Sequence, residues 1–199
     1  MVKYGLDKRI GMLVMNLSGT KVRNVVLGIL VGTAIPSAFI SEASIAPMFL
    51  PIAMALYTLT SKKIGDATQL GKLLMMSIAI GCMVGAPMSP TGGARNAIMI
   101  GFLGNLGPEY EISFMQWMML GSFYTLFLGI FFAILLPFLY KPEVDDLSEA
   151  VNTLREDLKK HGDMTREQWM VAGIALLMII AWITDKDFIA PILGFPLGL

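Results

Sequence analysis

The chain has 199 residues, of which 55% are hydrophobic and 15% are charged. A soluble domain of this length cannot bury so much apolar surface, so the composition indicates an all-α, polytopic membrane protein. The 15 basic and 15 acidic residues cancel, and no basic patch is interleaved with aromatic side chains, which argues against nucleic acid as a partner. Cys82 and His161 are each the only residue of their type, so the chain offers no internal disulfide and almost no material for a His/Cys metal site.

Residues 1–20 carry apolar side chains at helical spacing, with charged side chains clustered near the start. This pattern predicts an amphipathic helix that lies in the membrane interface. Charged residues follow Met1 almost at once, so we expect no cleavable signal peptide. The chain ends within apolar sequence at residues 194–199, and we therefore expect it to be a fragment of a longer protein.

Residues 21–61 hold the first apolar segment, and basic residues flank it on both sides, among them Lys21 and Lys62. By the positive-inside rule, both flanks are cytoplasmic. The segment is too long for one crossing at about 20 residues each, and each half is slightly short for one. We therefore predict a re-entrant hairpin with its tip near residues 41–44. The alternative is two short complete spans, with Glu42 in an external turn.

Glu42 lies inside this apolar segment, in a stretch of small and polar residues between Pro36 and Pro47. An ionisable side chain within a membrane segment costs several kcal/mol and usually faces a partner, a cavity or a transport pathway. The flanking prolines and polar residues predict a helix that stops, turns and restarts, which bares backbone carbonyl and N–H groups at the turn. Transporters build ion and substrate sites from such interrupted helices.

Residues 68–107 hold the next apolar segment, which is interrupted at residues 85–96 by two prolines and three glycines. Proline removes a donor from the helix and glycine carries an entropic cost, so we predict a broken transmembrane helix. Unwound backbone at membrane depth is tolerated only where protein buries it or where it lines a water-filled cavity, so the break indicates a site. The alternative is a plain turn between two short spans.

Three further segments complete the chain. Residues 112–140 predict a transmembrane helix, with Trp117 and Tyr140 suited to the two interfaces. Residues 141–166 mix both signs of charge and carry apolar residues at heptad-like spacing, which predicts a cytoplasmic amphipathic helix packed on the protein's own surface; a coiled-coil contact is the alternative. Residues 167–199 predict a transmembrane helix and the truncated start of the next.

Apart from the charges in their flanks, the apolar segments hold only two charged side chains, Glu42 and Arg95. An intramembrane enzyme needs a pair of carboxylates, a metal-binding His cluster, or a nucleophile with a base, and none of these can be assembled here. The sequence therefore predicts that the protein is not an enzyme. A coupled transporter, an uncoupled channel and a non-transporting scaffold remain.

Four short motifs resemble the divalent anion/sodium symporters, a family that carries dicarboxylates, citrate or sulfate. Residues 39–44 (Phe-Ile-Ser-Glu-Ala-Ser) and 48–53 (Met-Phe-Leu-Pro-Ile-Ala) resemble that family's hairpin, which has Ser-Asn-Thr at its tip before a helix with Leu-Pro-Ile-Ala. Residues 89–96 (Ser-Pro-Thr-Gly-Gly-Ala-Arg-Asn) are similar to its Thr-Pro-x-Gly-Thr-x-Pro-Asn loop, and residues 114–117 (Phe-Met-Gln-Trp) to the opening of its following span. The resemblance covers nearly the whole chain.

The resemblance implies an inverted-repeat transporter of which this chain holds most of the first repeat and the start of the second. It implies a multi-pass protein of the cell membrane, in contact with lipid and forming a homodimer. It also implies a small divalent anion as substrate, sodium as the coupling ion, and no other cofactor.

The resemblance also assigns site residues. The cation-binding positions would be Ser37, Ser41, Glu42, Gly92 and Asn96. The substrate-binding positions would be Ser41, Ala43, Ser44, Gly93 and Arg95. The physical logic agrees, because carbonyl groups at the C-terminal end of a half-helix attract a hard cation, whereas N–H groups at the start of the next half-helix attract an anion. The alternative role of the serines is helix capping.

Two departures from the family pattern concern charge. The chain has Glu42 and Ala43 where the family has Asn-Thr, and Arg95 where the family has proline. An ionised Glu42 beside a dicarboxylate would repel it, so Glu42 is a sodium ligand, a proton carrier or the fixed partner of Arg95. The alternative function is therefore a proton-coupled carrier or cation antiporter on the same scaffold, with Glu42 as the protonatable group.

We predict that Glu42 and Arg95 pair, because they are the only opposite charges in the membrane segments and the family brings these two elements together. A buried guanidinium cannot lose its proton, so the arrangement of lowest free energy places it against a carboxylate. Orphaning one partner of a buried pair would cost about 3–5 kcal/mol. The rival hypothesis is that Arg95 holds the substrate and Glu42 serves the cation.

The hairpin model makes a topological prediction. In cysteine-accessibility experiments, Lys21→Cys and Lys62→Cys should be labelled from the cytoplasmic side. Glu42→Cys, inside the membrane dielectric, should resist rapid labelling by a membrane-impermeant reagent from outside. Rapid outside labelling at position 42 in every transport state, with none from inside, would instead favour two complete spans.

Overall fold

The computed structural model describes residues 16–159 and 165–184, and these residues are helical, without a β-strand. The all-α fold class is thus confirmed for this part of the chain. The α-helices are α2 (Val22–Ser37), α3 (Glu42–Ile64), α4 (Thr68–Gly85), α5 (Ala94–Leu106), α6 (Phe114–Leu139), α7 (Ser148–Lys159) and α8 (Arg166–Thr184). Short 3₁₀ turns are η2 (Ala86–Met88), η3 (Pro90–Gly92) and η4 (Pro108–Tyr110). The interfacial helix expected over 1–20 lies almost wholly outside the described residues, as does the segment after Thr184.

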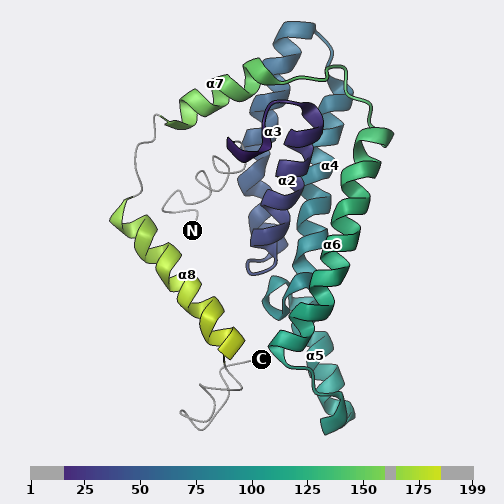
Figure 1. Cartoon of the computed structure of the whole chain (residues 1–199), viewed down its shortest axis with the longest axis vertical. Coiled ribbons are helices and arrows are strands. Elements are labelled where there is room, and N and C mark those ends of the chain that lie inside the picture. The colour runs from purple at the N-terminus through teal and green to yellow at the C-terminus, as the bar shows by residue number, and fades with distance from the viewer. Residues whose placement is uncertain (1–15, 160–164, 185–199) are drawn as a thin grey trace.

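Helices α2, α3, α4 and α6 run side by side as a bundle (Figure 1). Helices α2 and α3 form an antiparallel hairpin whose connection, residues 38–41, lies at the lower end of the pair in that view. Helix α4 continues through η2 and η3 into α5, which projects below the bundle. Helix α7 crosses its upper end, and α8 runs obliquely at its side. The helix predicted to be broken between residues 85 and 96 is therefore interrupted there.

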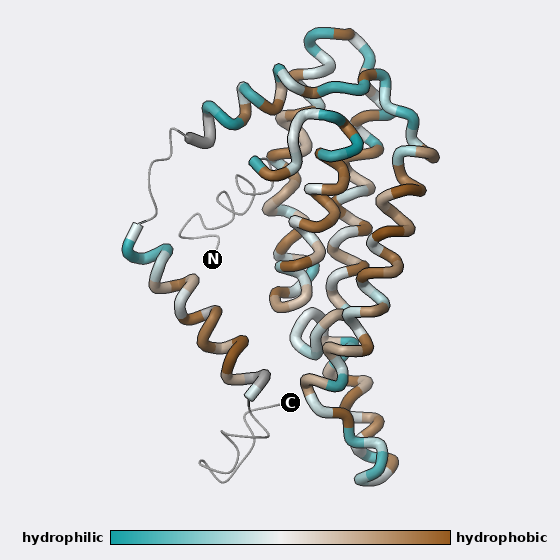
Figure 2. The backbone as a smooth tube through the Cα atoms, viewed as in Figure 1, coloured by the Kyte–Doolittle hydropathy of each residue, from teal (hydrophilic) through white to brown (hydrophobic). Residues whose placement is uncertain are grey.

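Among the described residues, three stretches are long and apolar enough to cross a membrane: Glu42–Ile64, Thr68–Met88 and Phe114–Leu139. Helix α2 is also apolar, but its 16 residues extend only about 24 Å, less than the ~30 Å of a bilayer's hydrocarbon core. Figure 2 shows hydrophobic residues along the length of the bundle and hydrophilic ones gathered at its upper end. These helices are those of a polytopic membrane protein.

Helix α2 packs closely on α4 because α4 presents glycines to it. A Cβ atom on Gly81 would lie 2.0 Å from Thr33 Oγ1, and one on Gly85 would lie 2.1 Å from the Ala34 carbonyl oxygen. Only glycine permits this approach of two backbones. The largest fully buried side chains around the contact are Ile29, Ile45, Phe49, Leu56, Leu70, Leu73 and Leu74. They hold α2, α3 and α4 as one packed unit.

The segment before α7 and its first turn bind this unit at its upper end. The Val22 amide donates to the Asp145 carbonyl at 3.0 Å, and the Leu147 amide donates to the Thr20 carbonyl at 2.8 Å. Lys63 forms an ion pair with Glu149, and apolar residues at the start of α7 are buried in the core of the bundle. In the part of the chain described, this amphipathic helix therefore packs on α3 of its own chain.

Glu143 caps α4 from a distance, which the sequence did not predict. Its Oε1 accepts from the Gln69 amide at 2.7 Å and its Oε2 from the Leu70 amide at 2.9 Å. The residue at the N-cap position, Ala67, has no side chain that can do this. Desolvation acts to raise the pKa of the Glu143 carboxyl, and the nearby Asp66 also raises it, but the backbone hydrogen bonds outweigh both and lower the pKa below 4.5.

Replacing Glu143 with alanine should destabilise the bundle by about 1 kcal/mol, the usual cost of a lost helix cap. Because the folded-state pKa is depressed, this contribution is fully present above pH 4.5 and is lost as the pH falls through the lower folded value. Thermal unfolding of the purified protein at several pH values measures the difference. Asp145→Ala, which removes a nearby carboxylate, is the control and should have little effect. An equal loss in both variants would contradict the capping role.

Candidate functional site

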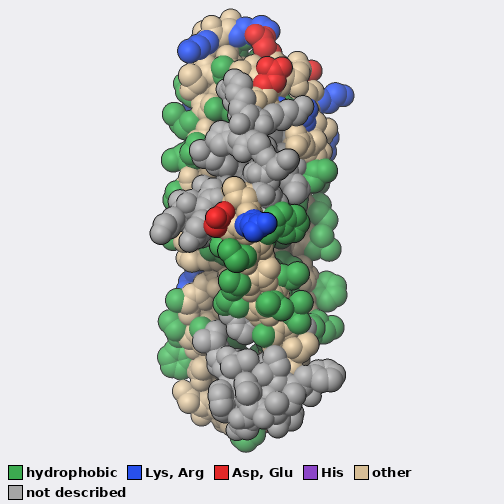
Figure 3. Space-filling model, turned by 90° about the vertical axis from the view of Figure 1, so that its left-hand side faces the viewer, with side chains coloured by type: hydrophobic (Ala, Val, Ile, Leu, Met, Phe, Trp, Pro, Cys, Tyr) green, Lys and Arg blue, Asp and Glu red, His purple; other side chains and the backbone are tan. Residues whose placement is uncertain are grey.

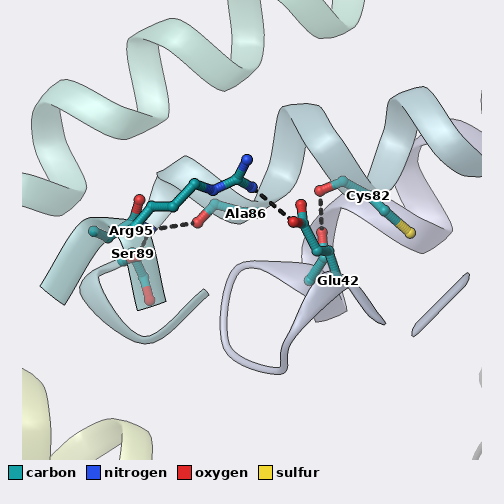
Figure 4. Close-up of polar contacts among 7 residues, drawn as sticks. Glu42, Cys82, Ala86, Ser89 and Arg95 are labelled. Carbon is teal, nitrogen blue, oxygen red and sulfur yellow. Dashed lines mark hydrogen bonds and ion pairs between the residues drawn. The ribbon is translucent and has the colours of Figure 1, made fainter. Parts of the chain in front are cut away.

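The connection between α2 and α3 lies against the break between α4 and α5. Ser89, in the break, donates its hydroxyl to the Ala38 carbonyl at 2.5 Å, and both residues are fully buried. The same hydroxyl oxygen accepts from the Thr91 amide at 3.2 Å, which begins the turn η3. The expectation that the two interruptions meet is therefore confirmed (Figure 4).

Asn96 fixes the shape of the break. Its side-chain amide, in the first turn of α5, donates to the carbonyl oxygens of Ala86 at 2.9 Å and Ser89 at 2.7 Å. The residue is buried, and its two bonds reach back across the break from the helix that follows. Asn96 thus satisfies two carbonyl groups that the interrupted helix cannot bond internally.

Gly92 lies where three backbone carbonyl oxygens converge. A Cβ atom at this position would lie 2.1 Å from the oxygen of Ala86 and 2.9 Å from the oxygens of both Ala38 and Ser37. A glycine is required here by close approach of the backbone. Carbonyl oxygens from both interruptions therefore gather at one buried point, and a hard cation prefers such oxygen ligands.

Ser37 is the last residue of α2 and contributes to the same buried region. Its hydroxyl lies 3.1 Å from the Cys82 carbonyl oxygen and 3.0 Å from the Ala34 carbonyl oxygen, which holds the end of α2 against α4. A hydroxyl that donates still has lone pairs to offer. Three of the five predicted cation-binding residues, Ser37, Gly92 and Asn96, are thus brought together in the interior.

The contact between the α2–α3 connection and the break between α4 and α5 is called the junction below. The predicted substrate-binding residues lie on its solvent-exposed, or open, side. Ser41, Ala43 and Ser44 are exposed at the start of α3, and Ser41 makes no side-chain capping bond. Gly93 has open space where a side chain would be. Ser41 therefore does not cap α3, which was the alternative role for the serines. Its hydroxyl group is free of a capping bond and could contact a ligand.

Glu42 and Arg95 pair across the two interruptions, as the sequence predicts. Arg95 Nη2 donates to Glu42 Oε1 at 2.7 Å (Figure 4). The side chain of Arg95 is 70% exposed and that of Glu42 is 33% exposed. The expected burial of the pair is therefore corrected: the described chain covers only part of Glu42, because α5 projects from the bundle. An ion pair this exposed contributes about 0–1 kcal/mol, less than the loss expected for breaking a buried pair.

The other oxygen of Glu42 has a different environment. Its Oε2 atom is buried and has no hydrogen-bond partner among the described residues. The face of the molecule in Figure 3 carries hydrophobic side chains along much of its length, and acidic and basic side chains gather at its upper end. One oxygen of the Glu42 carboxylate is therefore bonded to Arg95, and the other is desolvated without a donor.

Helix α6 completes the junction with contacts that sequence reasoning did not predict. Trp117, expected at a membrane interface, donates its indole N–H to the Pro87 carbonyl at 3.0 Å, and Thr125 donates to the Val84 carbonyl at 2.9 Å. Gly121 lets α6 approach the break, since a Cβ there would lie 2.5 Å from the Pro87 oxygen. Ser89 was a member of the loop motif, but no pattern in the sequence marked its bond to the hairpin.

Two interrupted helices that meet inside an apolar bundle, with carbonyl oxygens on one side and a charge pair on the other, are the arrangement of a membrane transporter's binding site. The model of the family described as sodium:sulfate symporter transmembrane region matches residues 1–193, so the chain belongs to this family. Members of the family are membrane transporters and not enzymes.

Individual relatives cover nearly all of the chain. A citrate/succinate antiporter of Escherichia coli K12 is 26% identical over 93% of the chain and 39% of its own length. A sodium-dependent dicarboxylate transporter of Staphylococcus aureus USA300 is 25% identical over 94% of the chain and 37% of its own length. A chloroplastic dicarboxylate transporter 2 of Spinacia oleracea is 25% identical over 100% of the chain and 36% of its own length. The chain thus spans little more than a third of these relatives.

Replacing Asn96 with aspartate tests whether its amide holds the break together. Aspartate has no N–H donors and would face two carbonyl oxygens, so we expect a loss of about 1–3 kcal/mol in stability. Asn105→Asp makes the same chemical change on the exposed part of α5 and is the matched control. Thermal unfolding of both purified variants measures the difference. Equal stability of the two would show that the amide does not hold the break.

Proposed function

We propose that the protein is a secondary active transporter of the cell membrane, which moves a small divalent anion, dicarboxylate-like or sulfate, together with sodium ions. The observation that carries this proposal is the convergence of carbonyl oxygens from both interruptions around Gly92. The printed names of the family and of the relatives, which include a sodium-dependent dicarboxylate transporter, support it.

The cation belongs on the buried side in this proposal. Sodium is a hard ion that prefers oxygen ligands, and the C-terminal end of α2 supplies both oxygens and a negative dipole. Its ligands would be the serine hydroxyls, the Glu42 carboxylate, the loop backbone and the asparagine side-chain oxygen. These groups belong to Ser37, Ser41, Glu42, Gly92 and Asn96.

The anion belongs on the open side. The first turns of α3 and α5 begin beside each other, since Glu42 and Arg95 lie in them and are in contact. Both helices direct the positive ends of their dipoles toward this place. The substrate would meet Ser41, Ala43, Ser44, Gly93 and Arg95.

Transport requires that the junction open to each side of the membrane in turn. We propose that α2 and α3 form a re-entrant hairpin. The 16 residues of α2 support this, whereas α3, with 23 residues, is longer than expected and could cross a membrane by itself. A second hairpin and a second broken helix, outside this chain, would complete an inverted repeat, and two such subunits would form a homodimer. This arrangement places the junction between two aqueous sides.

A second function has one observation in its favour. Glu42 Oε2 is buried and unpartnered among the described residues, and a proton on this atom would relieve its desolvation. The alternative is therefore a proton-coupled carrier or cation antiporter on the same scaffold, with Glu42 as the protonatable group.

Uptake into proteoliposomes containing the full-length protein distinguishes the two functions. We expect radiolabelled succinate or sulfate to accumulate when an inward sodium gradient is imposed and not when potassium replaces sodium. Uptake that follows an imposed pH gradient and ignores sodium would favour the alternative. A current that does not saturate with anion concentration would indicate a channel.

Gly92→Ala tests the shared cation site. The added methyl group would press on three carbonyl oxygens, so we expect at least a tenfold loss of apparent sodium affinity or a loss of uptake altogether. Gly101→Ala, in open space on α5, is the matched control and should transport normally. Unchanged sodium affinity in Gly92→Ala would remove the shared site from the proposal.

A further inference from the structure

We propose that the Glu42 carboxylate is an internal competitor for Arg95, which the transported anion must displace before it binds. The inference rests on the proposed function, because it concerns the regulation of the same site. It adds a specificity-determining pair at two positions where the chain departs from the family pattern. In this scheme Glu42 occupies, with its own carboxylate, the place of a substrate carboxylate.

Arg95 has capacity that Glu42 does not use. Among the described residues, the guanidinium makes a single hydrogen bond of 2.7 Å, from Nη2 to Glu42 Oε1. A guanidinium carries five N–H donors in a planar fork that matches a carboxylate or sulfate through two parallel bonds. The Arg95 side chain is 70% exposed, which leaves room for an oxyanion to approach the guanidinium. An incoming oxyanion can therefore form a better bond with Arg95 than Glu42 does.

Glu42 is held in a position that costs free energy. Its Oε2 is buried without a hydrogen-bond partner among the described residues, while Oε1 makes the one bond to Arg95. A desolvated carboxylate oxygen without a donor is unfavourable. The observed pair is weakly held, and therefore easily exchanged.

The charges around the pair explain why displacement is required. The N-terminal ends of α3 and α5 and the Arg95 guanidinium are positive, and Glu42, the first residue of α3, balances them with one negative charge. While an ionised Glu42 stays in place, a divalent anion meets repulsion at the point where it would bind. Once Glu42 moves away, the same place attracts an anion.

The test uses the Michaelis constant for succinate at saturating sodium, measured in proteoliposomes with the full-length protein. We expect Glu42→Gln to lower this constant about fivefold, because succinate no longer has to break the exposed ion pair between Glu42 and Arg95. Arg95→Gln should raise it at least tenfold, because the charge-assisted bonds are lost. In the Arg95→Gln background, Glu42→Gln should not change the Michaelis constant further, because the guanidinium for which the Glu42 carboxylate competes is already absent.

A matched control is available at the other end of the bundle. Glu149→Gln also removes one carboxylate from an exposed ion pair, with Lys63, and should leave the constant for succinate unchanged. If Glu42→Gln does not fold, Glu42→Asp retracts the carboxylate from Arg95 by one methylene. It should lower the constant by a smaller factor.

The outcomes separate this inference from the proposed function. If the wild-type protein transports succinate but Glu42→Gln, or Glu42→Asp in its place, leaves the Michaelis constant unchanged or raises it, the competitor role is overturned and the proposed function stands. A lower constant that persists in the Arg95→Gln background would also overturn it. If the wild-type protein carries neither succinate nor sulfate, the proposed function fails, and the inference fails with it.

Discussion

The contact between the hairpin connection and the helix break is the constraint on which the rest of the site depends. Close packing of α2 on α4, through Gly81 and Gly85, leads both helices to end at the same level of the bundle. Two sets of backbone groups that have lost their helical partners are thereby placed face to face. The bond from Ser89 to the Ala38 carbonyl and the absence of a side chain at Gly92 keep them in contact. A side chain at Gly92 would separate the two interruptions.

The bared carbonyl groups of the break receive donors from several directions. Asn96 comes from α5, Trp117 and Thr125 come from α6, and Ser89 serves the hairpin connection. Each carbonyl oxygen has a second lone pair, so satisfying it with one donor does not exhaust it. The backbone is therefore held in place and still presents oxygen atoms, which is the property that an ion site in an apolar protein needs.

The junction has two chemically different sides. Its interior is buried and rich in carbonyl oxygen atoms, while its exposed side carries the pair of Glu42 and Arg95 beside the positive ends of two helices. Under the proposed function, a cation inside and an anion outside would lie close enough to stabilise each other, because the medium between them is of low dielectric. The exchangeable pair of Glu42 and Arg95 at the boundary would then regulate which ions enter.

The sequence by itself determined the membrane class, the presence of both helix interruptions, the amphipathic helix α7 and the pairing of Glu42 with Arg95, although the hairpin connection lies at residues 38–41 and not at 41–44. These follow from hydropathy, from proline and glycine, and from the scarcity of charge in apolar segments, all of which are properties of short stretches of chain. The tertiary structure alone decided that Glu143 caps α4, that Ser89 bonds Ala38 and that Arg95 lies exposed. Such contacts join residues 51 or 73 positions apart. They depend on how closely α2, α4 and α6 pack, and local patterns do not carry this information.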